Sequence, residues 1–366
     1  MNFSLAISQL WELYLFVIYI KQLEKIRAAS TTFKNNRDKN SSIRLKKQIT
    51  RVKSESINKL CVIVTNPIIE KKLTEKMKNN IILFTLTFIS FFAFGQKPKV
   101  KPVETTKPFV LGVIDEIQSK ELTEKRVLNI YLPEGYNQND TIKYPVIYLL
   151  DGSADEDFIH IVGLVQFNSF EWINQVPKSI VVGIATVDRR RDFTFPTTIQ
   201  EDKKTYPTSG HSDKFISFIE KELQPFIETK YKTNNDKTII GQSLGGLFAT
   251  EVLLKKPTLF NKYIIISPSL WWDNGSLLNQ NSNLLTENFN RKTDIYIGVG
   301  KEGLTPTKIP RVMEVDANLL TEKIKGSKSK KVKVFFDYLP QENHATIMHQ
   351  AVSNSFRLLY PITAKE

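Results

Sequence analysis

The sequence predicts an α/β fold with a mostly parallel sheet for residues 109–362, and two observations support this prediction. First, eight runs rich in β-branched or apolar residues recur along this part of the chain. Second, from the third run onward most runs are continuously apolar and are separated by helix-length segments, as expected for buried parallel strands joined by crossover helices. The runs lie at 110–117, 127–132, 146–150, 180–185, 238–240, 263–266, 295–299 and 332–339.

The first two runs differ from the others in their pattern. The stretch RVLNIYL alternates apolar and polar residues, which is typical of half-exposed strands, so we expect these two strands to be antiparallel. Helices are expected on both faces of the sheet. The segment 213–231 places Phe215, Phe218 and Leu223 on one face, and Pro225 is expected to kink it. The other expected helices lie at 244–254, 312–325 and 345–360.

The positive charge of the chain is concentrated near its N-terminus. Residues 1–95 carry 16 Lys and Arg against 6 Asp and Glu, whereas residues 96–366 carry 35 against 32. A basic protein often binds nucleic acid or membranes, but here the excess lies outside the predicted domain. Residues 1–76 are interpreted as a disordered or non-native basic extension; the alternative is a membrane-surface anchor built on the apolar stretch 10–20.

A predicted signal peptide accounts for residues 77–95. Lys78 follows Met77, a 14-residue apolar run extends from 81 to 94, and cleavage is expected after Gly95. The run is short for a membrane span, which needs about 20 residues; a true anchor is the alternative. We therefore expect translation from Met77, export to the periplasm or medium, a linker at 96–108, and no stable membrane association after cleavage.

One short motif carries the chemistry. Gly241-Gln242-Ser243-Leu244-Gly245 fits G-x-S-x-G between an expected strand and an expected helix. In that setting the turn projects the serine hydroxyl outward, which predicts a nucleophile. The alternative is a small residue that only permits a tight turn.

A serine nucleophile needs a base and an orienting acid. His344 follows the last expected strand, where motifs of this kind place their histidine, so it is the predicted base. Glu302 follows the preceding strand and is the first choice for the acid. Asp316, in the next helix, is the alternative.

Stabilisation of a tetrahedral intermediate requires N–H donors. The backbone N–H of Leu244 is one predicted donor. The turn after the third strand, at Gly152 and Ser153, is the predicted source of the second, although those residues also suit an ordinary turn.

Two further groups are candidates for substrate contact. Trp271 and Trp272 follow the strand after the nucleophile and suit stacking on a flat acyl group, or packing of their loop. Arg189 and Arg191 suit an anionic substrate, or pairing with neighbouring aspartates to fix their own loop.

Together these stretches resemble the putative-esterase family of α/β-hydrolases, which includes siderophore esterases and S-formylglutathione hydrolase. The resemblance covers about 108–360 and rests on YPVIYLLDGS, VVGIATVDRRRDFT, IIGQSLGGLFATEVLLKKPTLFNKYIIISPSLWWDNG and ENHATIMHQAV. It implies an α/β-hydrolase fold, with Ser243 and His344 as nucleophile and base, and Leu244 with the Gly152–Ser153 turn as the oxyanion hole.

The predicted function is therefore an exported serine esterase that acts on a small-molecule ester, with no metal or organic cofactor and no nucleic-acid partner. A siderophore ester and a carbohydrate-linked feruloyl or acetyl ester remain open as substrates, as does acyl transfer. The rival hypotheses are a non-catalytic binding homologue and a basic membrane- or nucleic-acid-binding protein that uses residues 1–60.

Overall fold

Residues 106–361 are the part of the chain that the computed structural model describes. The predicted extension at 1–76, the predicted signal peptide at 77–95 and residues 96–105 of the predicted linker lie outside these described residues. No helix within 106–361 has the length and apolar character needed to cross a bilayer.

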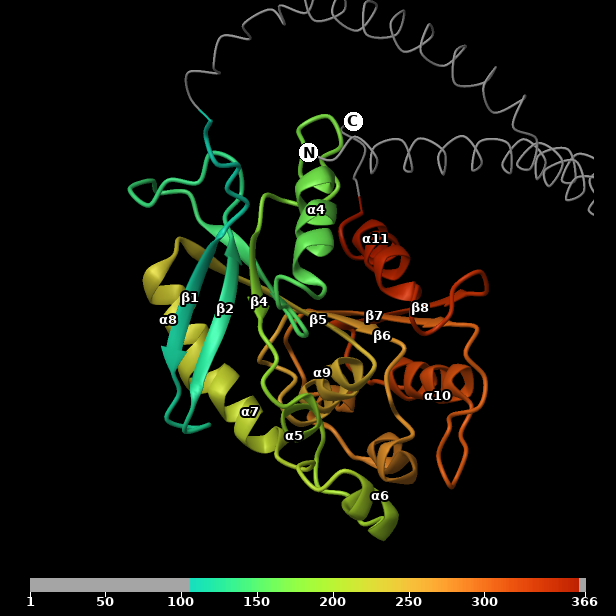
Figure 1. The fold of residues 1–366 in the computed structure, drawn as a ribbon. Helices are drawn as coiled ribbons and strands as arrows, with labels where there is room; N and C mark the ends of the chain where they lie inside the picture. The colour runs from blue at the N-terminus through green and yellow to red at the C-terminus, as the bar shows by residue number, and fades with distance from the viewer. Residues whose placement is uncertain (1–105, 362–366) are drawn as a thin grey trace, which may run out of the picture. The chain divides into compact units, whose positions relative to one another are not determined.

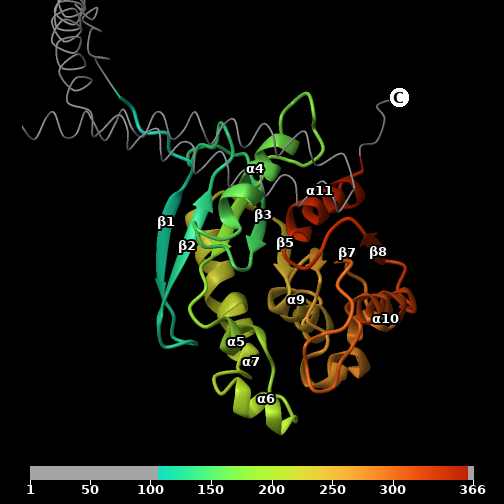
Figure 2. The ribbon, with the colours of Figure 1, turned by 45° about the vertical axis from the view of Figure 1, so that its right-hand side comes forward.

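The described residues form one eight-stranded sheet in the order β1-β2-β4-β3-β5-β6-β7-β8. β1 pairs with β2 and β2 with β4 in antiparallel fashion, and all other neighbours are parallel, which confirms the predicted fold class. Figure 2 shows the antiparallel pair at one end of the sheet and β8 at the other. The strands are β1 (Val113–Gln118), β2 (Lys125–Tyr131), β3 (Tyr144–Leu149), β4 (Ile180–Ile184), β5 (Thr233–Gln242), β6 (Lys262–Ile266), β7 (Thr293–Gly300) and β8 (Val332–Leu339).

Helices cover both faces of the sheet (Figure 1). They are α4 (Phe158–Asn168), α5 (Arg189–Phe193), α6 (Gln200–Thr205), α7 (Ser212–Phe218), α8 (Gln224–Lys230), α9 (Leu244–Lys255), α10 (Met313–Lys325) and α11 (Ile347–Leu359). A π-helical turn, η1 (Ile219–Leu223), joins α7 to α8, and two 3₁₀ segments, η2 (Trp272–Asn279) and η3 (Asn283–Leu285), follow β6.

The sheet separates two hydrophobic cores. Val146 and Tyr148 of β3 point into the core shared with α7, α9 and α10, whereas Ile147 and Leu149 point into the core shared with α4 and α11. This follows from the two-residue period of a strand, and it explains why β3 is apolar at every position. Burial on both faces therefore holds the central strands in register.

The predicted kink at Pro225 takes the form of the π turn η1. Pro225 has no N–H, and its ring would clash with the carbonyl four residues earlier in a regular α-helix. At η1 the N–H of Gln224 bonds to the carbonyl of Ile219, five residues back, and the wider turn accommodates the proline. The expected helix 213–231 is thus interrupted but continues in the same direction.

α4 is not among the helices expected from the sequence. Its side chains are apolar on most sides, and Phe158, Ile161, Val162 and Val165 are buried. A segment with so little contrast between its faces lacks the 3.6-residue signal of an amphipathic helix. α4 packs beside α11, so the expected two-sided cover of the sheet depends on it.

Sheet topology determines where a site can form. β3 lies between β4 and β5: the connection after β3 leads to β4 on one side, and the connection after β4 crosses back past β3 to β5 on the other side. In open parallel sheets, crevices form at the carboxyl ends of strands next to such a point. The turns that follow β3 to β8 all lie at this edge, and they carry the predicted functional residues.

Close backbone contact joins the turn after β3 to β4. A Cβ on Gly183 would lie 2.5 Å from the Gly152 carbonyl oxygen and 2.5 Å from the Phe158 ring. We predict that Gly183→Ala lowers the free energy of unfolding by about 1–3 kcal/mol, because the added methyl overpacks this contact. Urea denaturation provides the measurement.

Gly163→Ala is the matched control. Gly163 lies on the exposed side of α4, and a Cβ there meets no other described part of the chain within 4 Å. It should stabilise the protein by about 0.5–1 kcal/mol through helix propensity. Equal stability of Gly183→Ala and the wild type would contradict the close-contact interpretation.

Candidate active site

Ser243 occupies a strained turn between β5 and α9. Its backbone has φ 59° and ψ −118°, which a non-glycine residue adopts only when its surroundings enforce it. Gly241 makes the turn possible, because a Cβ there would lie 2.5 Å from the Gly245 carbonyl carbon. The Ser243 N–H bonds to the carbonyl of Ile266 in β6 at 3.0 Å, and its own carbonyl begins α9 by accepting from Leu247.

A chain of hydrogen bonds links Ser243, His344 and Glu302. His344 Nε2 lies 3.0 Å from Ser243 Oγ, and His344 Nδ1 lies 2.5 Å from Glu302 Oε2. Two-sided contact fixes the imidazole: its Nδ1 donates to the carboxylate, which leaves Nε2 free to accept from the serine hydroxyl. The three side chains come from turns after β5, β7 and β8, so the sheet edge brings them together.

Glu302 is a buried and fully bonded carboxylate. Its side chain is only 4% exposed, and besides His344 it accepts from the Ser267 hydroxyl and the Gly300 N–H. Burial favours the neutral acid, but the hydrogen bonds from His344, Ser267 and Gly300 outweigh it and hold the pKa of Glu302 below its ordinary value. Ionised Glu302 therefore stabilises the fold at neutral pH, and this contribution is lost as pH falls through the carboxyl range.

The loop that carries Glu302 is itself held in place. Glu314, at the start of α10, accepts from the backbone N–H groups of Glu302 at 2.9 Å and Gly303 at 3.0 Å. A carboxylate in the first turn of a helix is also stabilised by the helix dipole. Glu314 thus determines where the Glu302 backbone lies.

Asp316, the alternative acid, lies elsewhere. Its buried carboxylate pairs with Arg311 at 2.6 and 2.8 Å. The carboxylate that contacts His344 is that of Glu302.

Available backbone N–H groups flank the serine. Among residues 106–361, the N–H groups of Leu244 and Ser153 donate to no other protein group. Gly152 differs from the expectation: its N–H donates to the Ile184 carbonyl at 3.0 Å, so it has no donor left for a substrate. Gly152 instead allows the close approach to Gly183, and Ser153 is the residue of this turn whose N–H has no protein acceptor.

The adjacent tryptophans have different environments. Trp272 is buried and its indole N–H donates to the Phe195 carbonyl at 2.9 Å, so its ring is not available for stacking on a substrate. Trp271 is half-buried and lines a cavity of about 500 Å³ together with Tyr206, Asp202 and Lys308. Sequence alone did not separate the two rings, because the hydrogen bond that buries Trp272 is to Phe195, 77 residues away in the chain.

The two arginines expected to bind an anion contact protein groups. Arg191 pairs with Asp192 at 2.8 Å and with Glu124 at 2.6 Å. Arg189 pairs with Asp151 at 2.8 Å rather than with Asp188, the aspartate next to it in the sequence. Both side chains therefore fix the loop after β4, as the alternative interpretation expected for Arg191.

The cavity beside Trp271 is connected to Ser243 through the segment after β6, and neither Ser243 nor His344 lines it. Ser269 Oγ is 3.3 Å from Ser243 Oγ, and Trp271 follows it by two residues, which limits their Cα separation to about 7 Å. The opposite wall is tied to this segment, since Asp273 accepts from the Thr198 N–H at 2.6 Å and the Thr197 hydroxyl at 3.1 Å.

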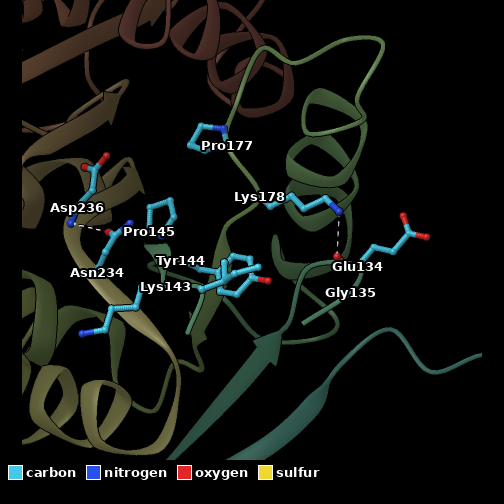
Figure 3. A pocket seen from close by; sticks show the side chains of 10 residues that line it. Glu134, Gly135, Lys143, Tyr144, Pro145, Pro177, Lys178, Asn234 and Asp236 are labelled. Atoms are coloured by element: carbon cyan, nitrogen blue, oxygen red, sulfur yellow. Dashed lines mark hydrogen bonds between the residues drawn. The ribbon is translucent and has the colours of Figure 1, made fainter. Parts of the chain in front are cut away.

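A second cavity, of about 450 Å³, lies at the opposite edge of the sheet (Figure 3). Tyr144 and Asn234, at the amino ends of β3 and β5, line it, and Lys178 donates to the Glu134 carbonyl at 3.1 Å across its rim. The length of the strands separates this second cavity from Ser243.

Several residues of the site were missed by sequence reasoning. Ser267 and Ser269 flank Pro268 directly after β6, and their hydroxyls contact Glu302 and Ser243 respectively. The Gln242 side chain donates to the His344 carbonyl and joins the base loop to the serine turn. The only signal was position: Ser267 and Ser269 follow β6 and Gln242 ends β5, at the same sheet edge as Ser243.

The arrangement suits acyl transfer to a serine. A hydroxyl bonded to a neutral imidazole, which an anionic carboxylate orients, is an activated nucleophile. Within residues 106–361, no three His, Cys, Asp or Glu side chains are grouped in a way that would hold a metal ion.

Comparison with known proteins agrees with this chemistry. Ferri-bacillibactin esterase BesA of Bacillus subtilis is 29% identical over 272 residues, which covers 70% of this chain and 93% of that protein. The siderophore triacetylfusarinine C esterase of Aspergillus fumigatus is 33% identical over 205 residues, 51% of this chain and 63% of that protein. The crystal structure of an IroE-like serine hydrolase from Shewanella oneidensis superposes with a TM-score of 0.60 at 31% identity, covering 68% of this chain and 80% of that one.

The family model described as "Putative esterase" matches residues 119–344, which contain every residue of the serine site described above. The match spans more than half of the chain. The protein therefore belongs to the putative esterase family of α/β-hydrolases and is a carboxylic ester hydrolase.

Proposed function

We propose that the protein is an exported serine esterase that hydrolyses a siderophore ester through an acyl-enzyme on Ser243. The observation that carries the mechanism is the continuous hydrogen-bond chain from Ser243 Oγ to His344 at 3.0 Å and from His344 to Glu302 at 2.5 Å. In the proposed roles Ser243 is the nucleophile, His344 the general base and acid, and Glu302 the orienting carboxylate.

Acylation begins with attack of Ser243 Oγ on the ester carbonyl carbon as the hydroxyl proton moves to His344 Nε2. The carbonyl oxygen becomes an oxyanion, for which the N–H groups of Leu244 and Ser153 are the proposed donors. Collapse of the tetrahedral intermediate breaks the bond to the alcohol oxygen, and His344 returns its proton to that oxygen. Glu302 stays ionised throughout and stabilises the imidazolium.

Deacylation repeats these steps with water. His344 takes a proton from a water molecule as the oxygen of that water attacks the acyl carbon. The proton then passes to Ser243 Oγ as the acid leaves. His344 is exposed to solvent, which supports access by water. A sugar hydroxyl in place of that water would give acyl transfer.

The siderophore assignment rests on the relatives, which are named for ferri-bacillibactin and triacetylfusarinine C. The cavity beside Trp271 supports a substrate larger than a simple acetyl ester, and its half-buried indole suits a flat group. We propose that Trp271 contacts the substrate there. Arg189 and Arg191 are not part of this proposal, because their charges are paired within the protein.

We predict that Ser243→Ala abolishes turnover of every ester that the wild type accepts, because the variant lacks the attacking oxygen. The measurement is hydrolysis of a panel containing a catecholate trilactone, a trihydroxamate ester, a feruloyl sugar and an acetylated sugar. The siderophore esters should give the highest kcat/KM. Ser269→Ala, which removes a neighbouring hydroxyl, is the matched control and should retain turnover.

Turnover in Ser243→Ala would contradict the mechanism. A preference of the wild type for the sugar esters would instead replace the siderophore assignment with the carbohydrate-esterase one.

Glu302→Gln should lower kcat by about 10³–10⁴-fold, because the amide no longer holds the imidazole in its tautomer or stabilises its charge. Asp316→Asn should leave kcat unchanged but cost about 1–3 kcal/mol of stability, since Arg311 loses its partner. Steady-state kinetics and thermal unfolding of both variants separate the two effects. The reverse pattern would identify Asp316 as the functional acid.

Export is proposed from the pattern at 77–95. We predict that the mature protein, recovered from the periplasm or the medium of a Gram-negative host, begins at Gln96. N-terminal sequencing is the measurement. A mature chain that retains residues 1–76 would contradict both the export proposal and the interpretation of that segment as non-native.

A further inference from the structure

Arg189 lies between two parts of the active site. It opens α5, in the loop after β4, and its guanidinium contacts residues that follow two other strands. Its Nε donates to both carboxylate oxygens of Asp151, at 2.8 and 3.0 Å, and one terminal nitrogen donates to the Gln242 carbonyl at 3.1 Å. A planar guanidinium suits this task, because its donors have a fixed geometry.

Asp151 controls the turn that carries Ser153. It has φ 51°, an unfavourable region for a residue with a side chain, and its carboxylate also accepts from the Thr186 hydroxyl at 3.1 Å. Such a conformation persists only where side-chain contacts enforce it. The bonds from Arg189 and Thr186 supply that enforcement.

Gln242 immediately precedes Ser243 in the strained turn. Its carbonyl accepts from Arg189, and its side chain donates to the His344 carbonyl. A Cβ on Gly245, two residues beyond the serine, would lie 3.4 Å from Asp151, so the two turns touch directly. Arg189 therefore connects the turn of Ser153, the turn of Ser243 and, through Gln242, the loop of His344.

We propose that Arg189 is a positioning residue that holds the Ser153 N–H and the Ser243 hydroxyl at the spacing the oxyanion requires. The inference rests on the proposed function, and it replaces the sequence-based expectation that Arg189 binds substrate. Without the hydrogen bonds from Arg189, the Asp151–Ser153 turn relaxes toward ordinary backbone geometry. The site then loses transition-state stabilisation while substrate binding in the cavity beside Trp271 remains.

The test measures kcat and KM for p-nitrophenyl acetate, a small uncharged ester, with Arg189→Ala and Arg189→Lys. A misplacement of about 1 Å at a reacting group costs on the order of 10²-fold, so Arg189→Ala should lose about that factor in kcat with KM nearly unchanged. Arg189→Lys should fall in between, because an ammonium does not span both Asp151 and Gln242. Millimolar methylguanidinium should restore part of the Arg189→Ala rate.

The inhibition constant of a trifluoromethyl ketone is a measurement that a general loss of stability would not change. It forms a tetrahedral adduct whose oxyanion occupies the same donors, so its inhibition constant should rise in proportion to the loss of kcat/KM. The matched control is Arg191→Gln, on the same turn, which breaks the pairs to Glu124 and Asp192. It should lower the melting temperature without changing kcat of the folded protein or the inhibition constant.

Two results would overturn the proposal. A wild-type kcat in Arg189→Ala would show that the Arg189 contacts to Asp151 and Gln242 are dispensable. A raised KM for anionic esters with kcat intact would show that Arg189 binds substrate instead. Failure of the serine mechanism is distinguishable, because it would appear as turnover in Ser243→Ala irrespective of Arg189.

Discussion

The tight passage from β5 into α9 is the constraint on which the site depends. Ser243 is held with a positive φ, and Gly241 passes so close to Gly245 that neither the strand nor the helix can shift without breaking the turn. The free energy of this strained backbone is offset by burial of β5 and α9 on the core they share. The buried β5 and α9 thus hold the half-buried Ser243 hydroxyl in place, and the imidazole of His344 lies within hydrogen-bond distance of it.

Electrostatics around the serine depend on the same edge of the sheet. Glu302 is buried, yet its pKa is lowered because His344, Ser267 and Gly300 all bond to the ionised form. Glu314 holds the backbone of that loop, and the paired arginines after β4 hold the neighbouring one. Charges near the site are therefore compensated within the protein, and the ionised carboxylate of Glu302 is bonded to the imidazole of His344.

The sequence predicted the parts of the structure that have a local physical cause. The eight strands were predictable because buried β-branched runs are separated by helix-length segments. Ser243 was predictable because Gly241 and Gly245 stand two residues before and after it, between a strand and a helix. His344 followed from its place after the last strand. Glu302 was the first choice over Asp316 for the same positional reason, but only its contact with His344 distinguishes the two.

The directions in which side chains point could not be predicted from the sequence. Trp271 and Trp272 are adjacent and identical, yet Trp272 is buried against Phe195, 77 residues away in the chain, whereas Trp271 lines the cavity. The N–H of Gly152 donates to the Ile184 carbonyl, whereas the N–H of Ser153 does not. No local sequence pattern encodes this difference. The Arg189–Asp151 pair joins residues 38 positions apart, and α4 lacked any periodic signal.

The central claim is that the hydroxyl at 243 forms the covalent intermediate, and tandem mass spectrometry of the protein treated with a fluorophosphonate tests it most directly. The account predicts a single adduct on the peptide 238–254, located at Ser243 and suppressed when a competing ester is present. Inhibition accompanied by an adduct at another residue, or by none, would contradict it.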